Sequence, residues 1–219
     1  MKWKKWKARV PSALALSLEE SMRRDLLLLN NPVLVQGLAL TPAVGVTTTL
    51  QNALVLSAAA LLLITPVRLI GDLLYERIPS RLRMLVYSII AALVYIPAVI
   101  ILSLVFGAQV NNAGIFLPVL IVDGVVLSRA EIPSREGIGY ALRNGLMTSF
   151  GVSMVLVLTG AVREFLGAGK LYGVQLLKTA PLPVASTVAG GFITVALFAA
   201  ALQAVANRYK RARAGGDAK

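Results

Sequence analysis

The sequence predicts an all-α, polytopic membrane protein, and three observations support this fold class. The chain has 219 residues, of which 57% are hydrophobic and only 15% are charged, and its mean hydropathy is +0.77. Soluble domains average about 45–50% apolar and about 25% charged residues. Apolar blocks recur along the chain at close to the ~20 residues that a spanning helix needs. Lysine and arginine collect in the tails and links between these blocks, where orientation signals belong.

Composition also excludes several classes of function. The chain has no cysteine and no histidine, which excludes disulfides, zinc sites built from those residues, histidine-ligated haem and thiolate-ligated iron–sulfur clusters. The net charge of +12 lies at the ends of the apolar blocks, so it indicates contact with a lipid bilayer and not with nucleic acid. We also expect no metal site and no catalytic residues, because no nucleophile–base pair or pair of carboxylates stands at a useful spacing.

Residues 1–32 are expected to form a basic, amphipathic segment at the cytoplasmic face of the membrane. Met1–Arg9 alternates lysine with tryptophan, a pattern typical of a membrane-surface anchor. Ser17–Glu20 fits a capping box, with serine at the N-cap and glutamate three residues later. The box predicts a short interfacial helix that ends at Asn30-Asn31-Pro32.

Six apolar blocks define a membrane domain over residues 33–206, and a basic tail follows over residues 207–219. With the N-terminus inside, nineteen of the 22 lysines and arginines fall on the cytoplasmic side of six spans and three on the other side. This bias predicts that both termini are cytoplasmic. The blocks are residues 33–50, 52–70, 82–106, 114–128, 144–162 and 184–206.

The first and fourth blocks are short and contain helix breakers. The first has Pro42 ahead of Gly45, and the fourth has Pro118 ahead of the pair Asp123-Gly124. Proline removes a backbone donor and glycine loosens a helix, so we expect both spans to be broken near their centres. Interrupted segments in matching places of two three-helix sets predict an inverted repeat with a site at the repeat interface.

Asp123 is the first candidate for an ion path. An aspartate deep in a span costs about 2.5–3.5 kcal/mol on insertion scales, so it normally faces protein or water. One hypothesis is a proton or sodium carrier, because an ionisable group at a broken helix can bind and release a cation. The alternative is structural, with the carboxylate capping a half-helix or pairing with an arginine. The sequence leaves both open.

A polar run within and after the first block supplies further ion-path candidates. Thr47, Thr48 and Asn52 offer oxygen ligands for a hard cation such as sodium. The alternative is hydrogen bonding between helices, for which threonine and asparagine are common in membranes. Arg129–Glu131 and Arg163-Glu164 close the fourth and fifth spans, where boundary ion pairs and anchors are expected.

Four stretches carry a resemblance to a known family. They are Asn30-Asn31-Pro32, LALTPAVGVTTTLQNAL at residues 38–54, GIFLPVLIVDGVVLSRAE at residues 114–131 and REFLGAGKLYG at residues 163–173. In this order they resemble the integral membrane subunits of the Rnf electron transport complex and the sodium-translocating NADH:quinone reductase (Nqr). The most similar branch is the E-type subunit of Rnf, which corresponds to the D-type subunit of the reductase.

The resemblance implies an architecture and a set of partners. Members have six spans in two inverted halves, and each pairs with a homologous membrane protein of opposite topology, in this case one that resembles the A-type subunit of Rnf. Flavin-bearing membrane subunits belong to the same complex, which lies in the prokaryotic cytoplasmic (inner) membrane. We therefore expect a multi-pass protein of that membrane with both termini in the cytoplasm.

The resemblance also implies a cofactor from which this chain departs. In typical members each of the two paired subunits supplies two cysteines at its broken helices, and together they hold a 2Fe-2S cluster. Thr41 and Gly124 stand at those cysteine positions in this chain. A hydroxyl and a hydrogen cannot replace thiolates, so we expect this chain to bind no cofactor.

Two functional hypotheses follow. The first is a membrane subunit of an Rnf/Nqr-like ion-translocating electron transport complex, which is not catalytic alone and belongs to a translocase only within the complex. The alternative is a stand-alone or homodimeric ion transporter or channel that uses the same inverted-repeat fold. The partners that accompany the chain distinguish the two.

Overall fold

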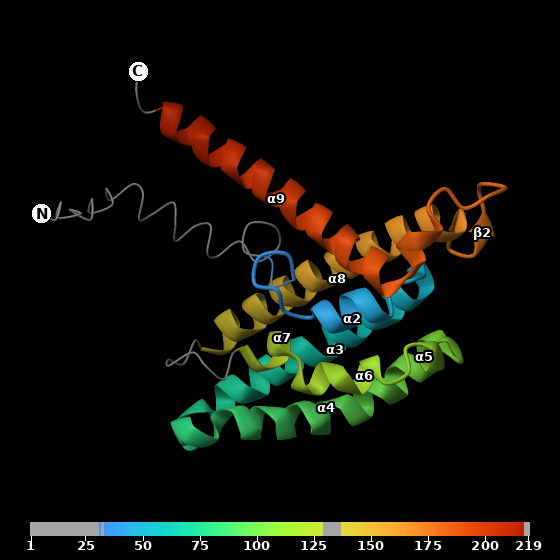
Figure 1. The fold of residues 1–219 in the computed structure, drawn as a ribbon. Coiled ribbons are helices and arrows are strands. Elements are labelled where there is room, and N and C mark those ends of the chain that lie inside the picture. The colour runs from blue at the N-terminus through green and yellow to red at the C-terminus, as the bar shows by residue number, and fades with distance from the viewer. Residues whose placement is uncertain (1–30, 32, 129–136, 217–219) are drawn as a thin grey trace, which may run out of the picture.

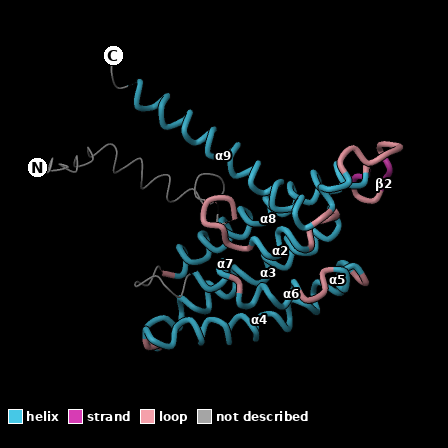
Figure 2. The backbone as a smooth tube through the Cα atoms, in the orientation of Figure 1, coloured by secondary structure: helices cyan, strands magenta, loops and turns pink. Residues whose placement is uncertain are grey.

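The structure is a computed structural model that describes residue 31, residues 33–128 and residues 137–216. This part of the chain is predominantly helical (Figure 1, Figure 2). The α-helices are α2 (Leu40–Gly45), α3 (Leu50–Leu74), α4 (Arg83–Phe106), α5 (Gln109–Asn112), α6 (Phe116–Val119), α7 (Gly124–Leu127), α8 (Ile138–Ala168) and α9 (Val188–Gly216). The 3-10 helices are η1 (Tyr75–Arg77), η2 (Ser80–Leu82), η3 (Leu120–Val122) and η5 (Pro183–Ser186), and the strands are β1 (Lys170–Leu171) and β2 (Val174–Gln175).

Three helical stretches of the described chain are long and apolar enough to cross a membrane. They are Leu50–Arg77, Ser80–Phe106 and Ile138–Ala168, and two shorter apolar stretches are Phe116–Leu127 and Val188–Ala201. The predicted helical membrane protein is therefore confirmed at this level. α8 extends beyond the predicted block at both ends. Its 31 residues give a length of about 46 Å, so its ends project past a hydrocarbon core of about 30 Å.

Helices α3 and α8 form the central pair and run antiparallel (Figure 1). Small residues bring their backbones close together: a Cβ added at Gly160 would lie 2.5 Å from Ala53 Cβ, and one at Gly145 would lie 3.2 Å from Thr65 Cα. Such close approach is the usual basis of helix association in membranes, where lipid is as apolar as the helix faces. Close packing of the two helix backbones therefore stabilises the pair.

Hydroxyl groups add polar contacts along the same interface. Ser153 Oγ donates to Ser57 O at 3.2 Å, and Ser57 Oγ donates to Ser153 O at 3.4 Å. Further along, Thr65 Oγ1 and Ser149 Oγ lie 3.0 Å apart. Hydrogen bonds of this kind between membrane helices contribute about 0.6 kcal/mol each on average. They favour one register of α3 against α8.

Helix α4 covers α3 and presents its other face to the outside. Tyr87 and Leu102 of α4 are buried, whereas Leu93 and Leu104 are exposed. A helix with only one buried apolar face in a membrane protein presents the opposite face to lipid. Helix α9 begins against α2 and α8 and diverges from them toward its C-terminal end (Figure 1).

Both predicted broken spans are interrupted, but not at the residues that the prolines indicated. Pro42 and Pro118 lie inside α2 and α6. Each occupies the third helical position, where the missing backbone N–H would have no partner within the helix. The actual breaks lie at Gly37–Ala39 and at Asp123, where the backbone leaves the helical region. The fourth span is therefore interrupted at the predicted Asp123-Gly124 pair, whereas the first is interrupted ahead of Leu40–Gly45 and not within it.

A two-stranded hairpin follows α8. Strands β1 and β2 pair antiparallel, with Leu171 opposite Val174. Tyr172 and Gly173 connect them, with φ of 55° and 78°, as a type I′ turn requires. The hairpin lies at the end of the bundle that also carries α5, opposite to η1 and η2 (Figure 1).

Some predictions concern residues outside the described part of the chain. The surface anchor and capping box within residues 1–30 lie there, as does Arg129–Glu131. The structure describes the backbone of α9 through Gly216, which covers most of the predicted tail at residues 207–219.

Candidate functional site at two chain breaks

The two chain breaks meet in the structure. Gly37 and Ala39 adopt positive φ values of 70° and 54° immediately before α2. The second break is at Asp123, whose extended backbone separates η3 from α7. A Cβ added at Gly124 would lie 2.7 Å from Leu38 Cδ2, so the residues of one break pack directly on those of the other.

The Asp123 carboxylate links the two breaks through one oxygen. Asp123 Oδ1 accepts a hydrogen bond from Val125 N at 2.9 Å and another from Ala39 N at 3.1 Å. The first bond makes Asp123 the N-cap of α7, a position that favours aspartate. The second bond reaches across 84 residues to the N-cap residue of α2. The carboxylate is half-buried, and this geometry gives it the capping role considered as the structural alternative.

The positions at which the family resemblance places cluster ligands lie beside this contact. Thr41 is exposed in the first turn of α2, and Gly124 is the first residue of α7. Neither supplies a thiolate, and a side chain at position 124 would require Leu38 to move. Among the described residues, no group of three or more carboxylates, cysteines or histidines lies close enough to hold a metal ion. The residues present therefore do not fit an iron–sulfur cluster.

The remaining ion-path candidates lie at the other end of α2. Thr47 is fully buried and donates to Ala43 O, whereas the Thr48 hydroxyl faces Val46 O at 3.5 Å. Asn52 Nδ2 donates to Val46 O at 3.4 Å. Six residues of α2 separate this group from Asp123, which is about 9 Å along a helix. The structure therefore does not bring the four predicted residues into one coordination shell.

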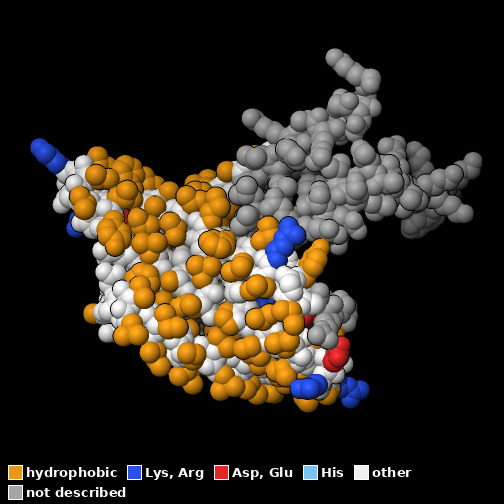
Figure 3. Space-filling view, turned by 180° about the vertical axis from the view of Figure 1, so that it is seen from behind, with side chains coloured by type: hydrophobic (Ala, Val, Ile, Leu, Met, Phe, Trp, Pro, Cys, Tyr) orange, Lys and Arg blue, Asp and Glu red, His pale blue; other side chains and the backbone are white. Residues whose placement is uncertain are grey.

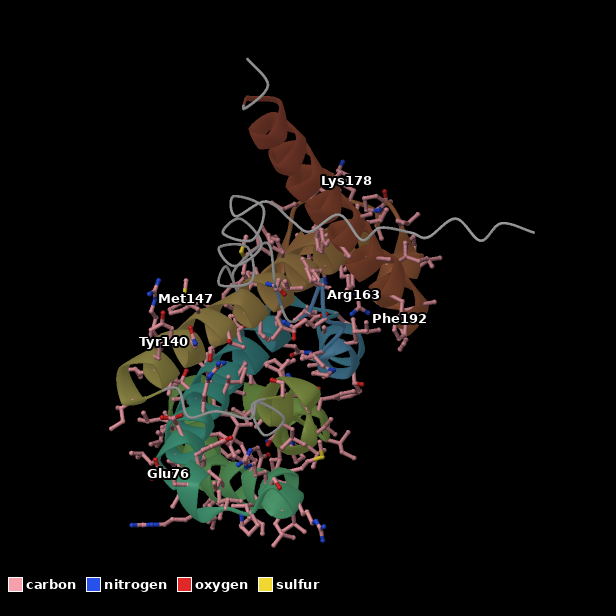
Figure 4. The ribbon with its side chains drawn as sticks, turned by 90° about the vertical axis from the view of Figure 1, so that its left-hand side faces the viewer. Glu76, Tyr140, Met147, Arg163, Lys178 and Phe192 are labelled. Atoms are coloured by element: carbon pink, nitrogen blue, oxygen red, sulfur yellow. The ribbon has the colours of Figure 1, made fainter. Side chains whose placement is uncertain are left out.

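Arg163 is the main buried charge near these residues. Its side chain is 0% exposed on α8, and its guanidinium lies where α8 meets α2 and the start of α9 (Figure 4). The guanidinium donates to five neutral oxygens. They are Val44 O at 2.6 Å, Thr47 Oγ1 at 3.1 Å, Ala185 O at 3.0 Å, Ser186 O at 3.2 Å and Thr187 O at 2.9 Å. All five donors of the planar fork are used.

Glu164 anchors the backbone on the other side of α8. Its Oε2 accepts from Leu50 N at 2.8 Å and from Tyr172 N at 3.2 Å, and its Oε1 accepts from Gly173 N at 2.8 Å. It thereby satisfies an N–H of the first turn of α3 and fixes the hairpin turn. The sequence predicted boundary ion pairs and anchors for Arg163-Glu164. The structure gives them the anchoring role through backbone groups.

Sequence reasoning did not predict the burial of two polar residues, Asn31 and Asp72. Asn31 Nδ2 donates to Gly151 O at 2.8 Å, and Asn31 Oδ1 accepts from Val33 N at 2.9 Å. Asp72 is 1% exposed near the end of α3. The available signal was position: each is a polar residue next to an apolar block, where burial requires partners.

Helices of membrane-spanning length packed around two facing chain breaks define a helical membrane protein whose candidate site lies where the breaks meet. A family model described as "Rnf-Nqr subunit, membrane protein" matches residues 21–201. The chain belongs to this family. The match includes both breaks, Asp123 and the Arg163-Glu164 anchors.

Curated relatives carry one recurring name, that of the E-type subunit of an ion-translocating oxidoreductase complex. The relative of this name from Shewanella amazonensis is 41% identical over 145 residues, which are 65% of this chain and 62% of the relative. The one from Shewanella loihica is 40% identical over 151 residues, which are 68% of this chain and 65% of the relative. The matched region thus spans less than two thirds of the length of these relatives.

Proposed function

We propose that this chain is the E-type membrane component of an Rnf-type ion-translocating oxidoreductase complex. Family membership and the name shared by its relatives support this function. The observation that carries it is the contact between the two breaks. That contact lies beside Thr41 and Gly124, the positions at which the resemblance puts the cluster ligands of typical members.

In this role the chain is a scaffold of the membrane core and binds no cofactor. Electrons pass through flavins and clusters that other subunits hold. The partners are a homologous membrane protein of opposite topology, similar to the A-type subunit of Rnf, and the flavin-bearing membrane subunits. The carboxylate that holds the two breaks together supports this division of roles, because it keeps the broken helices joined without a cluster.

The proposed topology has six spans in two inverted halves over residues 33–206, in a prokaryotic cytoplasmic (inner) membrane. Residues 1–32 and the tail at 207–219 lie in the cytoplasm. Two features support it: α2 and the α6–α7 segment run in opposite directions, and the link through η1 and η2 lies at the end of the bundle opposite to α5 (Figure 1). The distribution of lysine and arginine agrees with the same orientation.

Purification of the tagged chain from its native membrane in mild detergent tests this function. We expect a homologous membrane protein and flavin-bearing subunits to be identified by mass spectrometry of the preparation. Variants with cysteine in place of Thr41 and Gly124 are the matched comparison, and the iron content and the electron paramagnetic resonance spectrum are measured for both preparations. Recovery of the chain alone, or as a homodimer, from membranes that contain the other subunits would contradict the proposal.

A second function is favoured by one observation, the carboxylate at a break between two helices. Under this alternative the chain is a stand-alone or homodimeric ion transporter or channel, with Asp123 and the polar group Thr47, Thr48 and Asn52 along the path. The test is sodium or proton flux into liposomes that contain the purified chain. Asp123→Asn should abolish flux while keeping the cap, because asparagine is an equally good N-cap. Absence of flux under any gradient eliminates this alternative.

A further inference from the structure

The segment between α8 and η5 turns its apolar side chains outward. Residues 170–179 are all exposed, and they include Tyr172 at 54% and Val174 at 63%. Leu176 is exposed to a similar degree. In water, a contiguous apolar patch of this kind marks an interaction surface.

The backbone of the same segment is fixed from the inside, so these side chains cannot fold inward. Glu164 accepts from the N–H groups of Tyr172 and Gly173. Gly169 O accepts from Leu176 N and Leu177 N, both at 3.0 Å. With its backbone hydrogen-bonded to buried groups, the segment has a defined shape before it meets a partner.

The charges of the segment point to an anionic surface. Lys170 and Lys178 bracket the stretch LYGVQLL, and no aspartate or glutamate occurs between Glu164 and Asp217. Lysines that flank an apolar patch extend their ammonium groups to lipid headgroups while the apolar side chains enter the acyl region. A tyrosine in such a patch prefers the same interfacial depth.

The patch is continuous with the surface that faces lipid. Phe165 of α8 and Val188 and Phe192 of α9 are exposed on either side of the segment in sequence. Figure 3 shows apolar side chains covering the face of the bundle up to the lobe at its upper left, where the hairpin lies, with basic side chains at the tip. Figure 4 labels Lys178 and Phe192 at this end of the molecule.

We propose that Lys170–Lys178 binds the bilayer interface at the end of α8. Tyr172, Val174 and Leu176 enter the outer part of the acyl region, and the two lysines bind anionic phospholipid headgroups. The hairpin thereby holds the end of α8 at a fixed depth, and Glu164 transmits this position to the first turn of α3 through Leu50 N.

The absence of cysteine from the chain allows a direct test with single-cysteine variants of the full-length protein. Val174→Cys carries an environment-sensitive nitrobenzoxadiazole label, and Asn111→Cys, an exposed position at the same end of the bundle, is the matched control. Each is reconstituted in vesicles of phosphatidylglycerol and phosphatidylethanolamine. Lipids with a nitroxide high on the acyl chain should quench the label at position 174 at least about threefold more strongly than at position 111. Aqueous iodide should show the reverse order.

A second labelled position, a change in lipid composition and a comparison with native membranes complete the test. Leu176→Cys provides an independent position and is expected to behave as Val174→Cys does. Replacing both lysines by glutamine should make lipid quenching independent of the phosphatidylglycerol content, because the headgroup attraction is lost. Equal iodide access at positions 174 and 111 in the vesicles would overturn the proposal. So would protection that is present in native membranes but absent in vesicles, since a protein would then cover the patch.

Discussion

Arg163 is a buried cation whose hydrogen bonds all lead to neutral oxygens. Carbonyl groups at the end of α2 and around the start of α9 receive four of the five bonds. Val44 lies in the last turn of α2, where the partial negative charge of the helix dipole favours a cation. Gly191 makes the arrangement possible, because a Cβ there would lie 3.0 Å from the guanidinium carbon of Arg163.

Arg163→Lys is expected to destabilise the protein although it keeps the charge. Lysine has three donors and arginine has five, so at least two of the five acceptors lose their partners, at about 1–3 kcal/mol for each one that is buried. We expect a loss of about 2–6 kcal/mol in the free energy of unfolding. The measurement is the fraction of monodisperse protein left after heating in detergent. Arg143→Lys on the exposed face of the same helix is the control and should leave this fraction unchanged.

Two substitutions of Asp123 distinguish its role as a helix cap from the effect of its negative charge. Asp123→Ala removes the acceptor of both Val125 N and Ala39 N, and loss of an N-cap alone costs about 0.5–2 kcal/mol. Asp123→Asn keeps an oxygen at the same place and should be within about 0.5 kcal/mol of the parent protein. Thermal unfolding of the two variants in detergent checks this order. Equal destabilisation by alanine and asparagine would show that the negative charge, and not the cap, holds the breaks together.

At the scale of elements, the contact of α3 with α8 depends on glycines of α8 such as Gly160, and a glycine of the same helix outside the contact should respond to alanine in the opposite way. Gly160→Ala places its Cβ 2.5 Å from Ala53 Cβ, and overpacking of this kind costs about 1–3 kcal/mol. Gly139→Ala on the same helix has open space around the new Cβ and should stabilise the helix by about 0.4–1 kcal/mol. Thermal unfolding in detergent measures both. Tolerance of alanine at Gly160 would show that α3 and α8 can separate without loss of the fold.

The sequence predicts the long helices well and the breaks only in part. Apolar length alone locates α3, α4 and α8, because a spanning helix needs a continuous apolar run. Proline marked the broken spans but not the break points, since Pro42 and Pro118 fit the first turn of a helix. The first break depends on positive φ at Gly37 and Ala39. Nothing in the residue type of an alanine indicates such a conformation.

The candidate site, too, could be predicted from the sequence only in part. Asp123 could be selected from sequence because a charge inside an apolar block requires a partner. Its partner, Ala39 N, is a backbone group 84 residues away. Residue type does not indicate which backbone N–H a carboxylate binds. Arg163 and Glu164 were selected as charges, but their backbone partners on other elements become visible only when the chain is folded.

At the scale of the whole molecule, the two ends of the bundle are expected to lie on opposite sides of the membrane. The link that contains Glu76 and the connection that contains Asn111 lie at opposite ends of α4 (Figure 1). Most lysines and arginines fall on the Glu76 side under the proposed topology. The chain lacks cysteine, so Glu76→Cys and Asn111→Cys each introduce a single thiol at an exposed position.

Labelling with a membrane-impermeant maleimide should therefore distinguish the two positions. In spheroplasts with an intact cytoplasmic membrane, the thiol at position 111 should react, whereas the thiol at position 76 should react only after permeabilisation. α4 connects the two positions, and its 24 residues are about 36 Å long, enough to cross a hydrocarbon core of about 30 Å. Reaction of both thiols in intact spheroplasts would mean that α4 does not cross the membrane, and the six-span topology would fail with it.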